Sequence, residues 1–189
     1  MTWYTFFKSL HVLAAVVWVG GASVVQLYAL RALADKDPQR QATFAKDTEV
    51  IGMRTFVPAS IVIILAAVGM MLNLHLSWGM NWTVFGLIVF FASFAVGAGF
   101  LGPESGRLAK LIEEHGADHP EVSARIRRIL MVSRIELVFL LAVVWNMVVK
   151  PSGSPGWFWG ALAVTAVLAV GVFVQHQRSA APVGVAATE

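Results

Sequence analysis

Long runs of apolar residues dominate the chain, and polar residues gather between them. The runs cover residues 5–30, 56–76, 82–101, 129–149 and 157–174. Each run approaches the ~20 residues that a helix needs to cross a hydrocarbon layer of ~30 Å. A helix also satisfies its backbone hydrogen bonds internally, as lipid requires. The pattern predicts an all-α fold, a polytopic membrane bundle of five transmembrane helices.

The segments between these runs predict how the bundle is connected. Short turns follow the second and fourth runs, whereas 31–55 and 102–128 are long and polar and are expected to be loops. An amphipathic helix is expected at 103–115 in the second loop, after Gly102-Pro103 has ended the third transmembrane helix.

The whole chain is expected to form one domain. Residues 1–176 make a single transmembrane bundle, because five spans leave no room for a further globular unit. Residues 177–189 are expected to form a disordered cytoplasmic tail.

The distribution of basic residues predicts the orientation of the bundle. Most of the 14 Lys and Arg residues fall in 31–55 and 102–128, whereas the opposite side has Lys8 and Lys150. Because short cytoplasmic loops retain Lys and Arg during insertion, the N-terminus is predicted outside and the C-terminus in the cytoplasm. We therefore expect a multi-pass protein of the bacterial cytoplasmic (inner) membrane.

Composition narrows the chemistry. Apolar residues make up 58% of the chain and charged residues 13%, which indicates lipid as the main partner. The net charge of +3 fits the basic loops of a membrane protein, so we expect no nucleic-acid partner. The chain has no cysteine, which excludes thiolate metal sites and iron–sulfur clusters.

His11 is the first candidate for a cofactor ligand. An imidazole inside a transmembrane span is costly unless it is bonded or coordinates a metal. The same helix face has the small residues Ala15 and Ala22, which would leave room for a flat macrocycle. The alternative is a histidine that only bonds a neighbouring helix, beside small residues that let helices approach closely.

His75 is the candidate partner of His11. The second span runs outward, so His75 is expected at the outer level of His11, where both could bind one haem iron or a copper ion. Methionines Met70, Met71 and Met80 lie near the same side and could be soft ligands. The alternative is a hydrated histidine at the interface and methionines that only pack.

Arg134 and Glu136 are charged residues inside the fourth span. Intramembrane charges are functional candidates, and a proton relay or a contact to a haem propionate would use them. Arg134 can extend toward the headgroups, whereas Glu136 lies deeper and is expected to pair with Arg54. The alternative is an ion pair that only fixes the bundle.

Two segments resemble known families. Residues 8–21, KSLHVLAAVVWVGG, resemble the first helix of HemJ-type protoporphyrinogen oxidases, of CopD-type copper-resistance membrane proteins and of a related uncharacterised family of predicted bacterial integral membrane proteins. Arg134-Ile-Glu136, followed by Val148-Val-Lys-Pro151, resembles the HemJ-type fourth helix.

The resemblance implies functional roles for the matching residues. In the HemJ-type family the first-helix histidine is implicated in binding b-type haem, which here corresponds to His11. Arg134 and Glu136 match the arginine and the carboxylate of its fourth helix. The HemJ-type third helix has a lysine and a histidine, and the run 82–101 has neither, which argues against porphyrinogen oxidation.

Three functions follow as hypotheses. The first is a haem b protein with a redox or electron-transfer role, in which His11 is an axial ligand and His75, a methionine or a partner subunit is the other. The second is a copper-handling, CopD-like transport protein. The third is a non-catalytic assembly subunit. A homo-oligomer or a membrane partner from a respiratory or haem pathway is compatible with each, and whether the protein is an enzyme stays open.

Overall fold

Helices make up the fold. The computed structural model describes residues 2–35, 37–151 and 155–180, and no strand occurs in these ranges. The elements in chain order are α1 (Trp3–Asp35), α2 (Pro38–Ile51), the π-helical η1 (Gly52–Phe56), α3 (Val57–Asn73), α4 (Asn81–Val96), the π-helical η2 (Gly97–Leu101), α5 (Gly102–His115), α6 (Pro120–Val149) and α7 (Pro155–Ala180). The all-α prediction is confirmed.

Four rods are long and apolar enough to cross a membrane. Trp3–Ala34 and Pro120–Val149 are single helices, whereas Gln39–Asn73 and Asn81–His115 are each built from two α-helices joined by a π segment. At 1.5 Å per residue, a rod of 35 residues is about 52 Å long and exceeds a hydrocarbon layer of ~30 Å. A shorter apolar stretch, Trp159–Val174, lies in α7.

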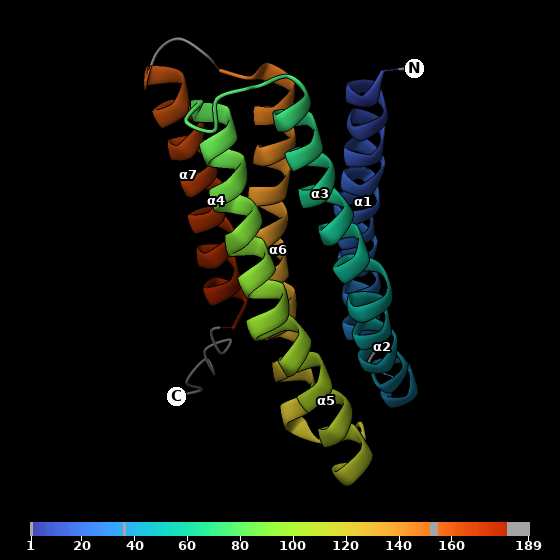
Figure 1. Ribbon diagram of the computed structural model, residues 1–189. Helices are drawn as coiled ribbons and strands as arrows, with labels where there is room; N and C mark the ends of the chain where they lie inside the picture. The colour runs from blue at the N-terminus through green and yellow to red at the C-terminus, as the bar shows by residue number, and fades with distance from the viewer. Residues whose placement is uncertain (1, 36, 152–154, 181–189) are drawn as a thin grey trace, which may run out of the picture.

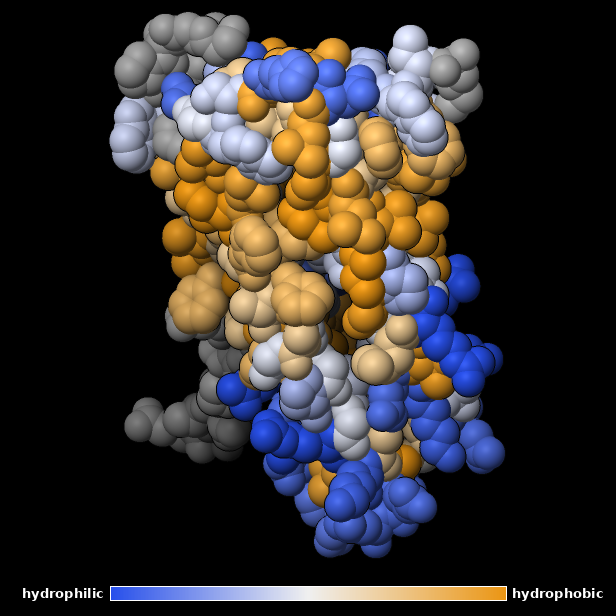
Figure 2. Space-filling view, viewed as in Figure 1, coloured by the Kyte–Doolittle hydropathy of each residue, from blue (hydrophilic) through white to orange (hydrophobic). Residues whose placement is uncertain are grey.

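The rods extend past the apolar layer at one end. In Figure 1, α2 and α5 lie together at the end of the molecule opposite the N-terminus. Figure 2 shows a hydrophobic band around the molecule below its upper rim, and hydrophilic residues gathered at the lower end, where Figure 1 places α2 and α5. We refer to the region formed by α2, α5 and the adjoining ends of α1 and α6 as the polar end.

Helix pairs organise the apolar part. α1 packs along α3, and α6 packs along α4 and α7 (Figure 1). The α1–α3 pair meets the other three helices where α1 contacts α6 and where the Trp18 ring makes an edge contact with the Phe90 ring of α4, with centroids 5.6 Å apart. Trp18 is buried there with Ala59 and Leu140, so four helices converge on one aromatic residue.

A second core lies at the polar end. Its buried members are Ala29, Ala32, Phe44, Ala45, Leu108, Val122, Ile126, Ile129 and Leu130, which come from α1, α2, α5 and α6. This core explains why segment 31–55 is not an irregular loop. The apolar side of α2 is buried, and α2 continues into the second membrane rod.

Two boundary predictions are wrong. Gly102-Pro103 does not end the third span, because Gly102 keeps helical φ and ψ and its N–H bonds Gly97 O in the π segment. Pro103 then lies in the first turn of α5, where its missing N–H costs little. The helix predicted at 103–115 is therefore a continuation of the span. At the C-terminus, 177–180 belong to α7, and the rest of the predicted tail lies outside the described residues.

Candidate functional site

His11 connects two transmembrane helices. Its Nδ1 lies 3.0 Å from the carbonyl oxygen of Ile63 in α3, and the side chain is half-buried. Because a carbonyl oxygen only accepts, Nδ1 is the donor and, in the neutral ring, Nε2 has a free lone pair. No hydrogen bond from the residues that the structure describes engages Nε2. The ring is therefore fixed at one nitrogen and available at the other.

His75 is not beside His11. It follows the end of α3 in the turn before α4, is exposed, and has a left-handed φ of 50°. From Ile63, the residue bonded to His11, to the end of α3 at Asn73 the helix rises about 15 Å. Two nitrogens on one metal lie within about 4 Å of each other, given metal–nitrogen bonds of ~2 Å. The predicted common level of the two histidines is wrong.

Arg134 and Glu136 lie in a different layer from His11. Ser133, beside them in α6, accepts a hydrogen bond from Gln26 of α1 with Nε2 and Oγ 2.7 Å apart. Gln26 and His11 are separated by about 22 Å along α1. The structure therefore does not bring these two charged residues together with either histidine.

Glu136 does not pair with Arg54. The Arg54 side chain is exposed in η1, and no ion pair or hydrogen bond from the described ranges engages the carboxylate of Glu136, which is half-buried. Glu136 shares a face of α6 with Ser133 and Leu140, which contact α1, whereas the Arg54 side chain is exposed. The roles of Arg134 and Glu136 remain predictions.

Two neutral polar residues inside the spans were not predicted as candidates. Gln26 is 7% exposed and bonds Ser133, and Asn146 is 3% exposed and donates from Nδ2 to the carbonyl oxygen of Trp82, 2.7 Å away. The sequence does signal them, since each interrupts an apolar run. They tie α1 to α6 and α6 to α4.

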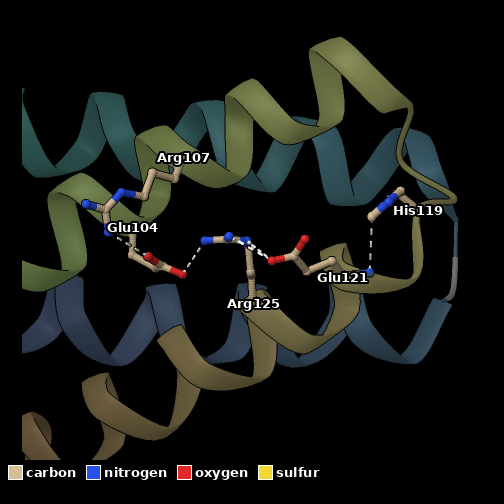
Figure 3. A network of polar contacts seen from close by, with 5 residues as sticks. All are labelled: Glu104, Arg107, His119, Glu121 and Arg125. Atoms are coloured by element: carbon tan, nitrogen blue, oxygen red, sulfur yellow. Dashed lines mark hydrogen bonds and ion pairs between the residues drawn. The ribbon is translucent and has the colours of Figure 1, made fainter.

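Charged groups at the polar end form a network of their own (Figure 3). Glu104 is 2% exposed, and its two carboxylate oxygens accept from Arg125 at 2.8 Å and from Arg107 at 3.4 Å. Arg125 also pairs with Glu121 at 2.8 Å, and the ring of His119 caps α6 by accepting from the Glu121 N–H. These contacts connect α5 to the start of α6.

Acidic, histidine and cysteine side chains do not cluster in a way that suits a metal ion in the described residues. Over the described ranges no group of three or more such residues could hold a metal ion. Met71 is buried, and Met70 and Met80 are half-buried near the same end of the bundle. A metal at His11 would therefore depend on a ligand from a methionine, a cofactor or another chain.

Long apolar helices with polar contacts between them define an integral membrane protein. The chain belongs to the family described as predicted integral membrane protein (DUF2269), which matches residues 5–151. No curated protein and no solved structure matches the chain. These comparisons do not support a relation to HemJ-type or CopD-type proteins, which stays a resemblance of two sequence segments.

Proposed function

We propose that this integral membrane protein binds a b-type haem through Nε2 of His11 and has a redox or electron-transfer role in the bilayer. The supporting observation is the contact of His11 Nδ1 with the Ile63 carbonyl, which leaves Nε2 with a free lone pair. Histidines that ligate metals commonly donate their other N–H to a carbonyl or carboxylate. That bond fixes the tautomer and the ring plane and makes the free nitrogen a better ligand.

The surroundings of His11 fit a flat, apolar group. Ala14 and Ala15, one turn along α1, are small, and the neighbouring Val12 and Leu13 are exposed to lipid. The bound group would supply a one-electron couple. The chain would hold the iron at one nitrogen, orient the ring through Ile63 and exclude water by the apolar span.

The second axial ligand would come from elsewhere than His75, which is too far along α3. A methionine of the outer end, or His11 of a second copy, remains compatible with the proposal. Arg134 and Glu136 are too deep to contact the same iron, so a role for them would be separate from ligation.

The test is a reduced-minus-oxidised visible spectrum of the purified protein, expressed with haem supplementation. His11→Asn is the decisive variant, because its side-chain N–H can still donate to Ile63 whereas it lacks Nε2. The parent should show the α band of b-type haem, and His11→Asn should fold and lose it. His75→Ala is the matched control and should keep the band. A parent without a Soret band, or His11→Asn with the full band, would contradict the proposal.

A second candidate is a non-catalytic assembly subunit. Three polar side chains within the spans each bond a neighbouring helix, which favours this function. His11 bonds α3, Gln26 bonds α6 and Asn146 bonds α4. Under this function the parent is colourless and binds no metal, and His11→Ala reduces assembly whereas His11→Asn restores it. The copper-handling alternative predicts instead a colourless parent with bound copper, measured by elemental analysis.

A further inference from the structure

A buried oxygen atom lacks a hydrogen-bond donor at the contact of α1 and α6. The amide nitrogen of Gln26 donates to Ser133 Oγ at 2.7 Å, but Gln26 Oε1 is buried and has no partner in the part of the chain that the structure describes. Buried polar atoms in native proteins nearly always have a partner, so an orphan acceptor points to a ligand, an ion or a water. The amide is held in place by Ser133, so Oε1 has a defined position.

Further oxygen atoms lie on the same face of α6. Ser133 Oγ accepts from Gln26 and donates to Leu130 O at 3.3 Å, which leaves it one lone pair. Glu136 is three residues further on, and residues at this spacing are neighbours on a helix face. Leu140, the next residue of this face, is buried against Trp18 and Ala59. Glu136 therefore lies between the Gln26 layer and the Trp18 layer.

Helix α1, which packs against α6, has a small side chain at the level of Glu136. Ala22 of α1 is four residues from both Trp18 and Gln26, so it occupies the layer of Glu136, and it is only half-buried. A methyl group leaves room for an ion beside the carboxylate. It offers no donor to the carboxylate.

No positive group compensates Glu136 from the neighbouring helices. The sequence has no titratable residue in 12–27 of α1, in α3, in α4 or in 155–174 of α7. In α6 the nearest is Arg134, two positions away, which faces another side of the helix. Arg54 of η1, which packs on α1, is exposed and forms no ion pair with Glu136. An uncompensated carboxylate at membrane depth is costly and is a functional candidate.

We propose that Gln26, Ser133 and Glu136 form a site for a small monovalent cation, Na⁺ or a proton, between α1 and α6. The atoms that would bind the cation are an amide oxygen, a hydroxyl oxygen and carboxylate oxygens, and hard cations prefer oxygen ligands. A Na⁺ ion would neutralise the carboxylate and satisfy Gln26 Oε1. A proton bound to Glu136 would also neutralise the carboxylate. The resulting O–H group would donate a hydrogen bond to Gln26 Oε1.

This site is independent of haem binding. His11 and Gln26 are about 22 Å apart along α1, so neither is needed to hold the other's ligand. His11→Asn should leave the cation response unchanged, and loss of the cation site should leave the visible spectrum unchanged. The two proposals can therefore fail separately.

Thermal unfolding of the purified protein, followed by tryptophan fluorescence, tests the site. NaCl replaces N-methylglucamine chloride at constant ionic strength, and the probe is Na⁺ alone. Tm of the parent should rise with Na⁺ in a saturable manner, and the rise should be lost in Glu136→Gln and in Gln26→Leu. Glu113→Gln, which removes an exposed carboxylate of α5, is the matched control and should keep the full rise.

The proton is distinguished by infrared spectroscopy. If a proton occupies the site, Tm is indifferent to Na⁺, and the parent shows a carboxylic acid C=O band at neutral pH that is absent in Glu136→Gln. Either result supports the site and identifies its occupant. A parent with neither a Na⁺ response nor that band would overturn the proposed site. The infrared comparison requires only one variant to fold, Glu136→Gln, whose side chain is nearly isosteric with that of the parent.

Discussion

Gly20 and Gly21 are adjacent residues of α1 with different surroundings. A Cβ atom on Gly21 would lie 2.8 Å from Cε1 of Phe56, whereas a Cβ on Gly20 would have no atom within 4 Å. Phe56 packs against the cluster of Trp18, Ala59 and Leu140, so its ring cannot move away freely. Close approach of α1 to Phe56 at the end of η1 therefore depends on one glycine of this pair and not on the other.

Gly21→Ala should destabilise the protein by about 1–3 kcal/mol, the usual cost of an added methyl group in a packed core. Gly20→Ala should change stability by less than ~1 kcal/mol, in the favourable direction, because alanine has the higher helix propensity. Unfolding in mixed micelles measures both. Equal effects of the two substitutions would show that α1 and η1 are not packed as described.

Single residues were predictable from the sequence when their chemistry was unusual for a span, and their contacts were not. His11 and Glu136 are conspicuous in apolar runs, and both are half-buried. The sequence could not show that His11 meets Ile63 or that Glu136 makes no ion pair with Arg54, because such contacts depend on the rotation of each helix. Gln26 was missed because a neutral amide is less conspicuous than a charge.

The π-helical segments are notable at the scale of the element. Each joins a membrane helix to a helix of the polar end, and a π turn holds one residue more than an α turn. η2 has Gly99, which is exposed and would have no atom within 4 Å of an added Cβ. The π turn takes up this extra residue, so α4 and α5 stay in one rod and each buries its own face.

Deletion of Gly99 should therefore be tolerated, because it converts η2 to α-helix and keeps the faces of α4 and α5 in register. Deletion of Ile88, an exposed residue in the middle of α4, should abolish folding, because it rotates all following residues by about 100° relative to their partners. The yield of monodisperse protein and its Tm, measured for both deletion variants, distinguish these outcomes. Loss of folding in the Gly99 deletion would contradict this role of the π segment.

The pairing of α5 with α6 depends on Glu104, whose side chain is 3% exposed while that of Arg125 is 27% exposed. Glu104→Gln should destabilise the polar end by about 1–3 kcal/mol. That is below the ~3–5 kcal/mol for breaking a fully buried pair, because Arg125 keeps Glu121.

Hydrogen exchange of α5 and the start of α6 measures this effect. Glu114→Gln, an exposed carboxylate of the same helix, is the control and should leave exchange unchanged. Equal exchange in the Glu104 and Glu114 variants would show that the buried network does not hold α5 on α6.

Elements were predicted from the sequence better than their ends. The hydrophobic runs located all the apolar helices, because lipid imposes their length and composition. The rods are longer than the runs, since the polar end continues them with helices whose buried residues, such as Phe44 and Leu108, form only part of a mostly polar sequence. Gly102-Pro103 misled because the helix continues through it: Gly102 keeps helical φ and ψ after the π segment, and Pro103 lies in the first turn of α5.

The orientation of the whole molecule in the membrane remains a prediction from its basic residues, and the absence of cysteine makes it easy to test. Thr2→Cys should react with a membrane-impermeant maleimide on intact cells, whereas Glu113→Cys should react only after the membrane is opened. Thr188→Cys reports on the fifth span and should behave as Glu113→Cys if α7 crosses. The reverse pattern for Thr2 and Glu113 would invert the assigned topology.

The pairing of helices differs from their order in the chain, and this has a consequence for synthesis. α3 and α4 are consecutive, yet α3 packs along α1 and α4 along α6. When α3 leaves the ribosome, its neighbour is already in the bilayer. α4 has to wait for α6, and until then the hydroxyls of Thr83 and Ser93, which are buried in the finished protein, face lipid or the insertion machinery. A nascent chain that stops before Pro120 therefore contains one completed helix pair and one helix without its partner.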